Sequence, residues 1–142
     1  MAMESAFLLP FVLHMLLILG LYVWLSVARA IAVYRREAAY DDFHRGDGDP
    51  ERTAAIARNL SNQFELPTLA WFVAVLLLAY GVIDTPDVVA AWVFLIGRLA
   101  HTAVQTLSRS VPLRGYVFVI GALPVVYLAG HLAWLVLAGP PQ

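Results

Sequence analysis

Three polar residues that could bind a charged ligand precede the second long apolar segment of the chain. Arg58, Asn62 and Glu65 follow one another at i, i+4 and i+7. At about 100° per residue, a helix would present them within an arc of roughly 60°. Pro67 is expected to bend this helix just past the cluster. The pattern predicts either one wall of a pocket or, for Arg58 above all, groups that are solvated because the helix has not yet entered the bilayer.

The third apolar segment carries a second polar stripe. Four residues share one helical face within roughly 80°, namely Arg98, His101, Gln105 and Arg109. Arg98 falls near mid-membrane, where an arginine costs about 2.5–3.5 kcal/mol and normally faces a partner or a wet cavity. It is expected to pair with Glu65, to contact a ligand, or to do both. His101 alone would be interpreted as an interior histidine, but within this stripe a binding role is favoured.

Together the stripes predict a cluster of guanidinium groups around one carboxylate. Arg114, which directly precedes the fourth apolar segment, belongs to the same level of the membrane. Guanidinium groups bind carboxylates in a bidentate manner, and a single Glu can bind an amine. The expected ligand is therefore an anion that carries an amine. No His or carboxylate spacing resembles a metal site, so His14 and His131 are interpreted as structural.

Composition sets the class of protein and excludes several chemistries. The 142 residues are 61% hydrophobic and 13% charged, with a mean hydropathy of +0.76, whereas about a quarter of the residues in soluble domains are charged. This composition predicts an integral membrane protein. Cysteine is absent, so any thiol chemistry needs a thiol that a ligand supplies. The net charge of −1 argues against nucleic-acid binding, which requires a basic patch.

The apolar segments predict a single all-α domain, residues 1–142, folded as a bundle of four transmembrane helices. Each segment can span roughly 30 Å of hydrocarbon at about 1.5 Å per residue. Helix-start signals occur at residues 49–51 and 85–87, where Pro and acidic residues stand together. We expect helices at about residues 6–34, 50–82, 86–108 and 113–138.

The placement of arginine predicts the orientation in the membrane. All nine basic residues are arginines, and they concentrate in the first and third connections, whereas both termini and the turn at residues 84–87 have none. By the positive-inside rule, both termini face the non-cytoplasmic side and the polar stripes lie in the cytoplasmic half. Because lysine and organelle signals are absent, we expect a bacterial inner membrane.

These residues resemble those of the MAPEG family, the membrane-associated proteins in eicosanoid and glutathione metabolism. The Asn-Gln-Phe-Glu-x-Pro stretch at residues 62–67 is most similar to the bacterial branch. The resemblance extends from the first helix to the fourth, and its motif residues are Arg58, Asn62, Glu65, Pro67, Arg98, His101, Thr102 and Arg114.

The resemblance implies a homotrimer of four-helix bundles that binds glutathione, as a co-substrate, between neighbouring subunits near the cytosolic face. Glu65 would face the free amine, and Arg98 would hold a carboxylate or support the pocket. The expected glutathione-binding residues are Arg58, Asn62, Glu65, Arg98, His101 and Gln105.

Arg114 matches the arginine that stabilises the thiolate in catalytic members of the family. The resemblance therefore implies a transferase or peroxidase that acts on hydrophobic or lipid substrates from the bilayer. Gln105 stands where catalytic relatives often have a tyrosine, which favours an alternative, a non-catalytic trimer that binds a lipid or an anion. A proton-coupled exporter is less favoured, because Glu65 lies near one interface and Arg98 cannot deprotonate.

Overall fold

The computed structural model describes residues 2–45, 49–108 and 110–139, which form helices and no strand. The helices are α1 (Ala2–Tyr34), α2 (Asp42–Arg45), α3 (Glu51–Asn62), α4 (Leu66–Tyr80), α5 (Thr85–Leu107) and α6 (Val111–Ala138). α3 and α4 together make the second of four spans that are long and apolar enough to cross a membrane. The predicted fold, an all-α bundle of four transmembrane helices, is confirmed.

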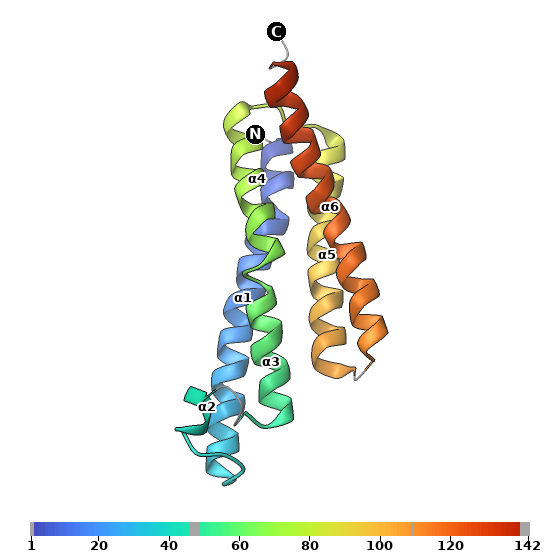
Figure 1. Ribbon diagram of the computed structural model, residues 1–142. Coiled ribbons are helices and arrows are strands. Elements are labelled where there is room, and N and C mark those ends of the chain that lie inside the picture. The colour runs from blue at the N-terminus through green and yellow to red at the C-terminus, as the bar shows by residue number, and fades with distance from the viewer. Residues whose placement is uncertain (1, 46–48, 109, 140–142) are drawn as a thin grey trace.

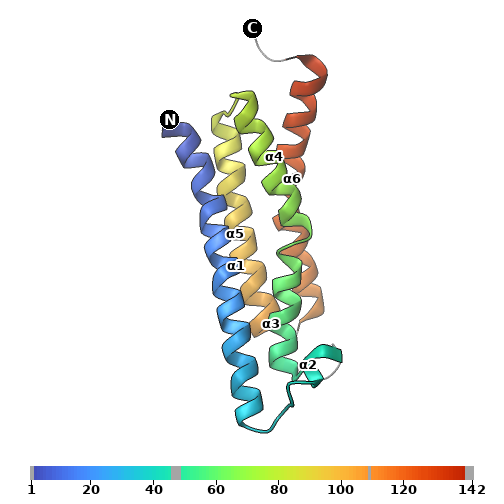
Figure 2. The same cartoon turned by 90° about the vertical axis from the view of Figure 1, so that its left-hand side faces the viewer.

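The four spans run antiparallel to their neighbours along the chain (Figure 1). The start of α1, the turn between α4 and α5 and the end of α6 lie at one end of the bundle. The short α2, the start of α3 and the connection from α5 to α6 lie toward the other end, as the view in Figure 2 also shows. The residues of the polar stripes therefore lie away from the end that holds the termini.

The interior of the bundle has two apolar clusters. An aromatic cluster near the termini contains Phe11, whose ring packs against Phe94 at 5.5 Å and against Trp71 at 5.5 Å. A second, aliphatic cluster joins α1 to α3 through residues such as Leu21 and Ile56. Many large apolar side chains remain exposed on the outside of the bundle, as a surface in contact with lipid tails requires.

α5 and α6 pack backbone against backbone at two glycines. A Cβ atom added to Gly97 would lie 2.9 Å from the Cα of Gly121, closer than real Cβ contacts. Small residues allow such close approach between membrane helices. This contact holds the two helices together midway along their length.

The second span is interrupted within the first polar stripe. α3 ends at Asn62 and α4 begins at Leu66, with Pro67 in its first turn. Proline lacks an N–H group, and its ring clashes with the carbonyl group four residues earlier, here that of Gln63. The bend was expected just past the cluster, but the interruption instead separates Glu65 from the two residues on α3. Glu65 therefore does not share a helical face with Arg58 and Asn62.

Candidate functional site

Three of the predicted site residues line one polar groove, although they come from three different helices. Arg58 of α3, Gln105 of α5 and Arg114 of α6 border a volume of about 580 Å³, within the usual range of small-molecule sites, about 300–1,000 Å³. The remaining lining residues are Glu51, Arg52, Ala55, Thr106, Leu107 and Ser108. The groove lies at the end of the bundle opposite the termini.

Hydrogen bonds between α3 and α5 bring Arg58 and Gln105 together. The side-chain amide of Asn59 donates to Thr102 Oγ1 at 3.3 Å, and the Thr102 hydroxyl donates to Asn59 Oδ1 at 3.4 Å. Because the helices are antiparallel, Arg58 lies one residue from this contact and Gln105 about one turn from it, toward the same end. This pairing sets the register of one wall of the groove against the other.

The tight connection between α5 and α6 brings Arg114 to the groove. α5 ends at Leu107, and Ser110 caps α6 by accepting a hydrogen bond from the backbone N–H of Leu113 at 3.4 Å. Arg114 is half-buried in the first turn of α6, where the helix dipole adds a positive potential to that of the guanidinium. Arg109, which belonged to the predicted stripe, lies outside the described residues.

The charges along the groove favour an anion. The lining residues contribute three guanidinium groups, those of Arg52, Arg58 and Arg114, and one carboxylate, that of Glu51. Arg52 was not expected here, because its spacing of six residues from Arg58 does not match a shared helical face. Guanidinium groups bind carboxylates and other planar anions with paired hydrogen bonds. The groove is thus suited to a ligand with more than one negative group.

A buried hydrogen-bond network lies deeper in the bundle, centred on Gln63. Its Oε1 accepts from Nε2 of His14 at 3.0 Å and from Nε of Arg98 at 3.0 Å. Its Nε2 donates to Oδ1 of Asn59 at 3.2 Å and to Oγ1 of Thr102 at 3.3 Å. Gln63 is 1% exposed. One side chain at the helix interruption therefore joins α1, α3 and α5.

The network determines the tautomer of His14 and holds Arg98 in place. Trp71 Nε1 donates to His14 Nδ1 at 3.2 Å, so the proton of the neutral ring is on Nε2. Arg98 also donates from Nη2 to the carbonyl oxygen of Asn62 at 3.2 Å. Among the described residues, no ion pair joins Arg98 to Glu65, which is exposed at the interruption. Neutral oxygen atoms, rather than a carboxylate, are thus the hydrogen-bond acceptors for the mid-membrane arginine.

Four predicted site residues lie outside the lining of the groove. Asn62 is half-buried and contacts Arg98, which is itself buried, whereas Glu65 is exposed. His101 is buried, with its ring 6.0 Å from that of Phe118, and no described residue forms a hydrogen bond to its Nδ1. A single chain therefore brings together Arg58, Gln105 and Arg114 but not the whole predicted set.

The predicted site residues did not include the three side chains that organise the network. Asn59, Gln63 and Thr102 are all buried and polar, yet they belong to the same stretches as the predicted residues. The spacing of Asn59 and Gln63 at i and i+4 was a usable signal, because it places two amides on one helical face. The missing information was which face of α3 turns inward.

A comparison of the sequence with models of protein families found one family that matches nearly the whole chain. The model of the MAPEG family matches residues 7–134 of the chain, a range that includes every residue of the groove and of the network. Comparisons with curated proteins and with solved structures found no match.

Proposed function

Because this chain belongs to the MAPEG family, we propose that it is a membrane-embedded glutathione-dependent transferase or peroxidase. The observation that carries the proposal is the groove that unites Arg58, Gln105 and Arg114. Its substrates are hydrophobic electrophiles or hydroperoxides that partition into the bilayer. Such compounds are concentrated in the membrane, so a site within the bundle meets them directly.

The composition of the groove fits a thiol peptide with two carboxylates. Arg52 and Arg58 supply guanidinium groups for the carboxylates, and Gln105 supplies an amide that can donate and accept hydrogen bonds. Arg114 remains for the thiol. The chain has no cysteine, so the ligand must provide the sulfur nucleophile.

Arg114 acts by stabilising the thiolate. A nearby guanidinium favours the charged form and lowers the pKa of a thiol from about 8.5 toward neutrality. The N-terminus of α6, in whose first turn Arg114 lies, acts in the same direction. The thiolate then attacks an electrophilic carbon or a peroxide oxygen, and the leaving group departs with the bonding electron pair.

The active unit in this proposal is a homotrimer. Arg58 and Glu65 are exposed on a single chain, so a neighbouring subunit could cover the groove and bring its own residues to the ligand. In that arrangement Glu65 binds the free amine, and Asn62, Arg98 and His101 support the pocket. The clustering of arginine at the groove end supports a cytoplasmic site, with both termini on the other side of the membrane. The Asn-Gln-Phe-Glu-x-Pro stretch at residues 62–67 and the absence of lysine support the bacterial branch of the family and a bacterial inner membrane.

One observation favours a second function. Gln105 is buried beside the groove and has no phenol with which to donate a proton to a departing group. A trimer that binds a lipid or an anionic metabolite in the same groove without turnover would need no such donor.

A titration with glutathione distinguishes the two functions. Detergent-purified protein is followed by thermal stability and by the ultraviolet absorbance of the thiolate, in the wild type, Arg114→Ala and Arg35→Ala. Arg35 is exposed at the end of the first span and outside the groove, so its variant is a matched control. We expect stabilisation and a thiolate signal that Arg114→Ala alone loses. Stabilisation without any thiolate signal would favour the binding protein. No stabilisation at millimolar glutathione would contradict the transferase or peroxidase.

A further inference from the structure

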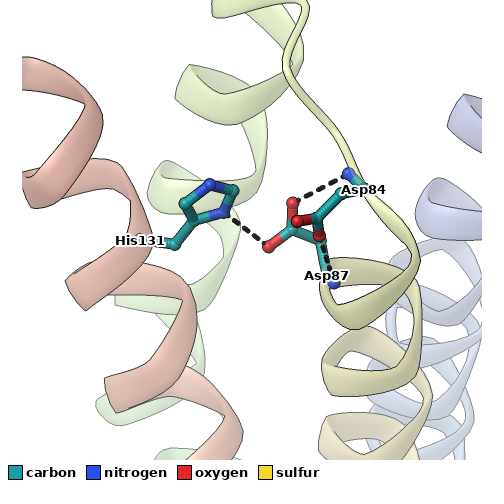
Figure 3. A group of neighbouring side chains, drawn as sticks. All are labelled: Asp84, Asp87 and His131. Atoms are coloured by element: carbon teal, nitrogen blue, oxygen red, sulfur yellow. Dashed lines mark hydrogen bonds and ion pairs between the residues drawn. The ribbon is translucent and has the colours of Figure 1, made fainter. Parts of the chain in front are cut away.

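Two aspartates and a histidine converge at the end of the bundle that holds the termini, far from the groove (Figures 1 and 3). Asp84 precedes α5, Asp87 lies in its first turn, and His131 comes from α6. Each residue offers one ligand atom, and these atoms all lie within 4.8 Å of one another. The histidine comes from a separate helix, so the convergence is a product of the packing of α5 against α6.

The cap of α5 uses only part of this cluster. Asp84 Oδ1 accepts from the backbone N–H of Asp87 at 3.0 Å, and Asp87 Oδ2 accepts from the backbone N–H of Asp84 at 3.1 Å. The second oxygen of Asp87, Oδ1, faces His131 Nδ1 at 2.8 Å. No described residue forms a hydrogen bond to the second oxygen of Asp84. The cap of α5 therefore leaves one oxygen of each carboxylate unused: that of Asp87 contacts the imidazole, and that of Asp84 has no hydrogen-bond donor among the described residues.

The charge of the cluster is not balanced by any basic side chain in its part of the sequence. Residues 1–28, 66–97 and 115–142 contain neither lysine nor arginine. Asp87 is nevertheless 0% exposed, and buried carboxylates are normally paired with a cation or bound to a metal. The only described cationic partner is the imidazole itself, which can carry one charge against two.

We propose that Asp84, Asp87 and His131 bind a first-row divalent metal ion, with Zn²⁺ as the best match. Carboxylate oxygens and an imidazole nitrogen form a mixed ligand set that suits such ions, and water would complete the coordination. The ion takes the place of the hydrogen bond between His131 Nδ1 and Asp87 Oδ1. This departs from the expectation that His131 is only structural.

The geometry requires little adjustment. Ligand atoms at 2.0–2.2 Å from Zn²⁺ lie about 3.3–3.6 Å apart in a tetrahedral site. The 2.8 Å distance between Asp87 Oδ1 and His131 Nδ1 must open by about half an ångström, and the exposed Asp84 must bring its second oxygen closer while Oδ1 caps α5. The rings of Trp134 and Tyr127, with centroids 6.2 Å and 6.3 Å from that of His131, flank the imidazole. A bound ion would tie α6 to the turn between α4 and α5.

The test is a metal titration of the full chain without a polyhistidine tag, after treatment with a chelator. Zn²⁺ at a concentration well above its dissociation constant should raise the thermal midpoint by about 5 °C, and Mg²⁺ should not, because an imidazole ligand disfavours it. No shift with Zn²⁺, or an equal shift with Mg²⁺, would overturn the proposal.

Two variants locate the site. Asp84→Asn keeps an oxygen that can cap α5 but removes the anionic ligand, and His131→Gln keeps a hydrogen-bond donor for Asp87. In the presence of chelator, the thermal midpoint of each variant should lie within about 2 °C of that of the wild type. Each variant should lose most of the rise in midpoint that Zn²⁺ causes in the wild type. If both retain the full shift, the ion binds elsewhere and the proposal fails. The thiolate signal of Asp84→Asn with glutathione should equal that of the wild type, so this site and the groove are tested separately.

Discussion

Replacement of Gln63 by methionine tests whether the buried network holds the interrupted span together. The two side chains have similar size and shape, so the substitution removes hydrogen bonds without opening a large cavity. Gln63 makes bonds to four side chains, those of His14, Arg98, Asn59 and Thr102. The variant leaves two buried donors, the ring N–H of the histidine and the Nε–H of the arginine, without an acceptor.

Two independent values bound the expected cost. A buried donor left without an acceptor costs about 1–3 kcal/mol, and more for a charged group, which gives roughly 2–6 kcal/mol for the pair. Hydrogen bonds between membrane helices measured singly average about 0.6 kcal/mol, which gives about 2.4 kcal/mol for four. We therefore expect Gln63→Met to lower the free energy of unfolding by about 2–4 kcal/mol, or the thermal midpoint by roughly 5–15 °C.

Gln63→Glu is the matched control. It keeps the Oε1 acceptor that His14 and Arg98 share, adds a charge that can pair with the arginine, and loses only the bonds donated to Asn59 and Thr102. Thermal unfolding of the three proteins in the same detergent, followed by circular dichroism, should rank the wild type and Gln63→Glu above Gln63→Met. A midpoint for Gln63→Met within 1 °C of the wild type would refute the reasoning, because the donors would then have found other partners.

Two further substitutions test the packing and the loop. Gly97→Ala should destabilise the bundle by about 1–3 kcal/mol, because its Cβ would meet Gly121 at 2.9 Å. Gly130→Ala is the control: its Cβ would meet nothing within 4 Å, so this variant should be neutral or stabilising by up to about 1 kcal/mol. Equal midpoints of the two variants in thermal unfolding would contradict the close contact of α5 and α6. Arg29→Ala removes the ion pair with Asp49, whose closest N–O distance is 2.6 Å. The rate of proteolysis between residues 36 and 50 should therefore increase severalfold in a timed digest. An unchanged cleavage rate would contradict a role of this ion pair in protecting the loop.

Most of the fold could be predicted from the chain alone. Four apolar segments of membrane length are a property of composition and run length, and each must be helical because the bilayer offers no other hydrogen-bond partner to the backbone. Helix-start signals at residues 49–51 and 85–87 also come from local chemistry, and α3 and α5 begin there, although the structure places the cap of α5 at Asp84. A break in the helix at Pro67 was predicted, but its position was not: the helix is interrupted before Glu65 rather than after it, because the proline ring clashes with the carbonyl group four residues earlier.

The candidate site could be predicted only in part. Arg58 and Gln105 were identified by residue type and helical spacing, since charged and amide groups are costly beside apolar runs. Arg114 was identified by its place before the fourth apolar segment and by the family resemblance. Their convergence on one groove depends on the register of α3 against α5, which the Asn59–Thr102 contact sets. No periodicity within one helix contains that register.

The sequence by itself therefore determined the class of protein, the number of spans, the end at which arginine gathers and the absence of a thiol in the chain. Only the tertiary structure decided that Gln63, rather than Glu65, receives the Arg98 guanidinium, and that His131 of α6 meets Asp87 of α5. The physical reason is that composition and helical periodicity act along one segment, whereas hydrogen bonds and metal ligation between helices depend on how each helix is rotated about its axis and shifted against its neighbours. Close contacts between helices, such as the backbone of Gly97 against that of Gly121, contribute to setting that rotation and shift.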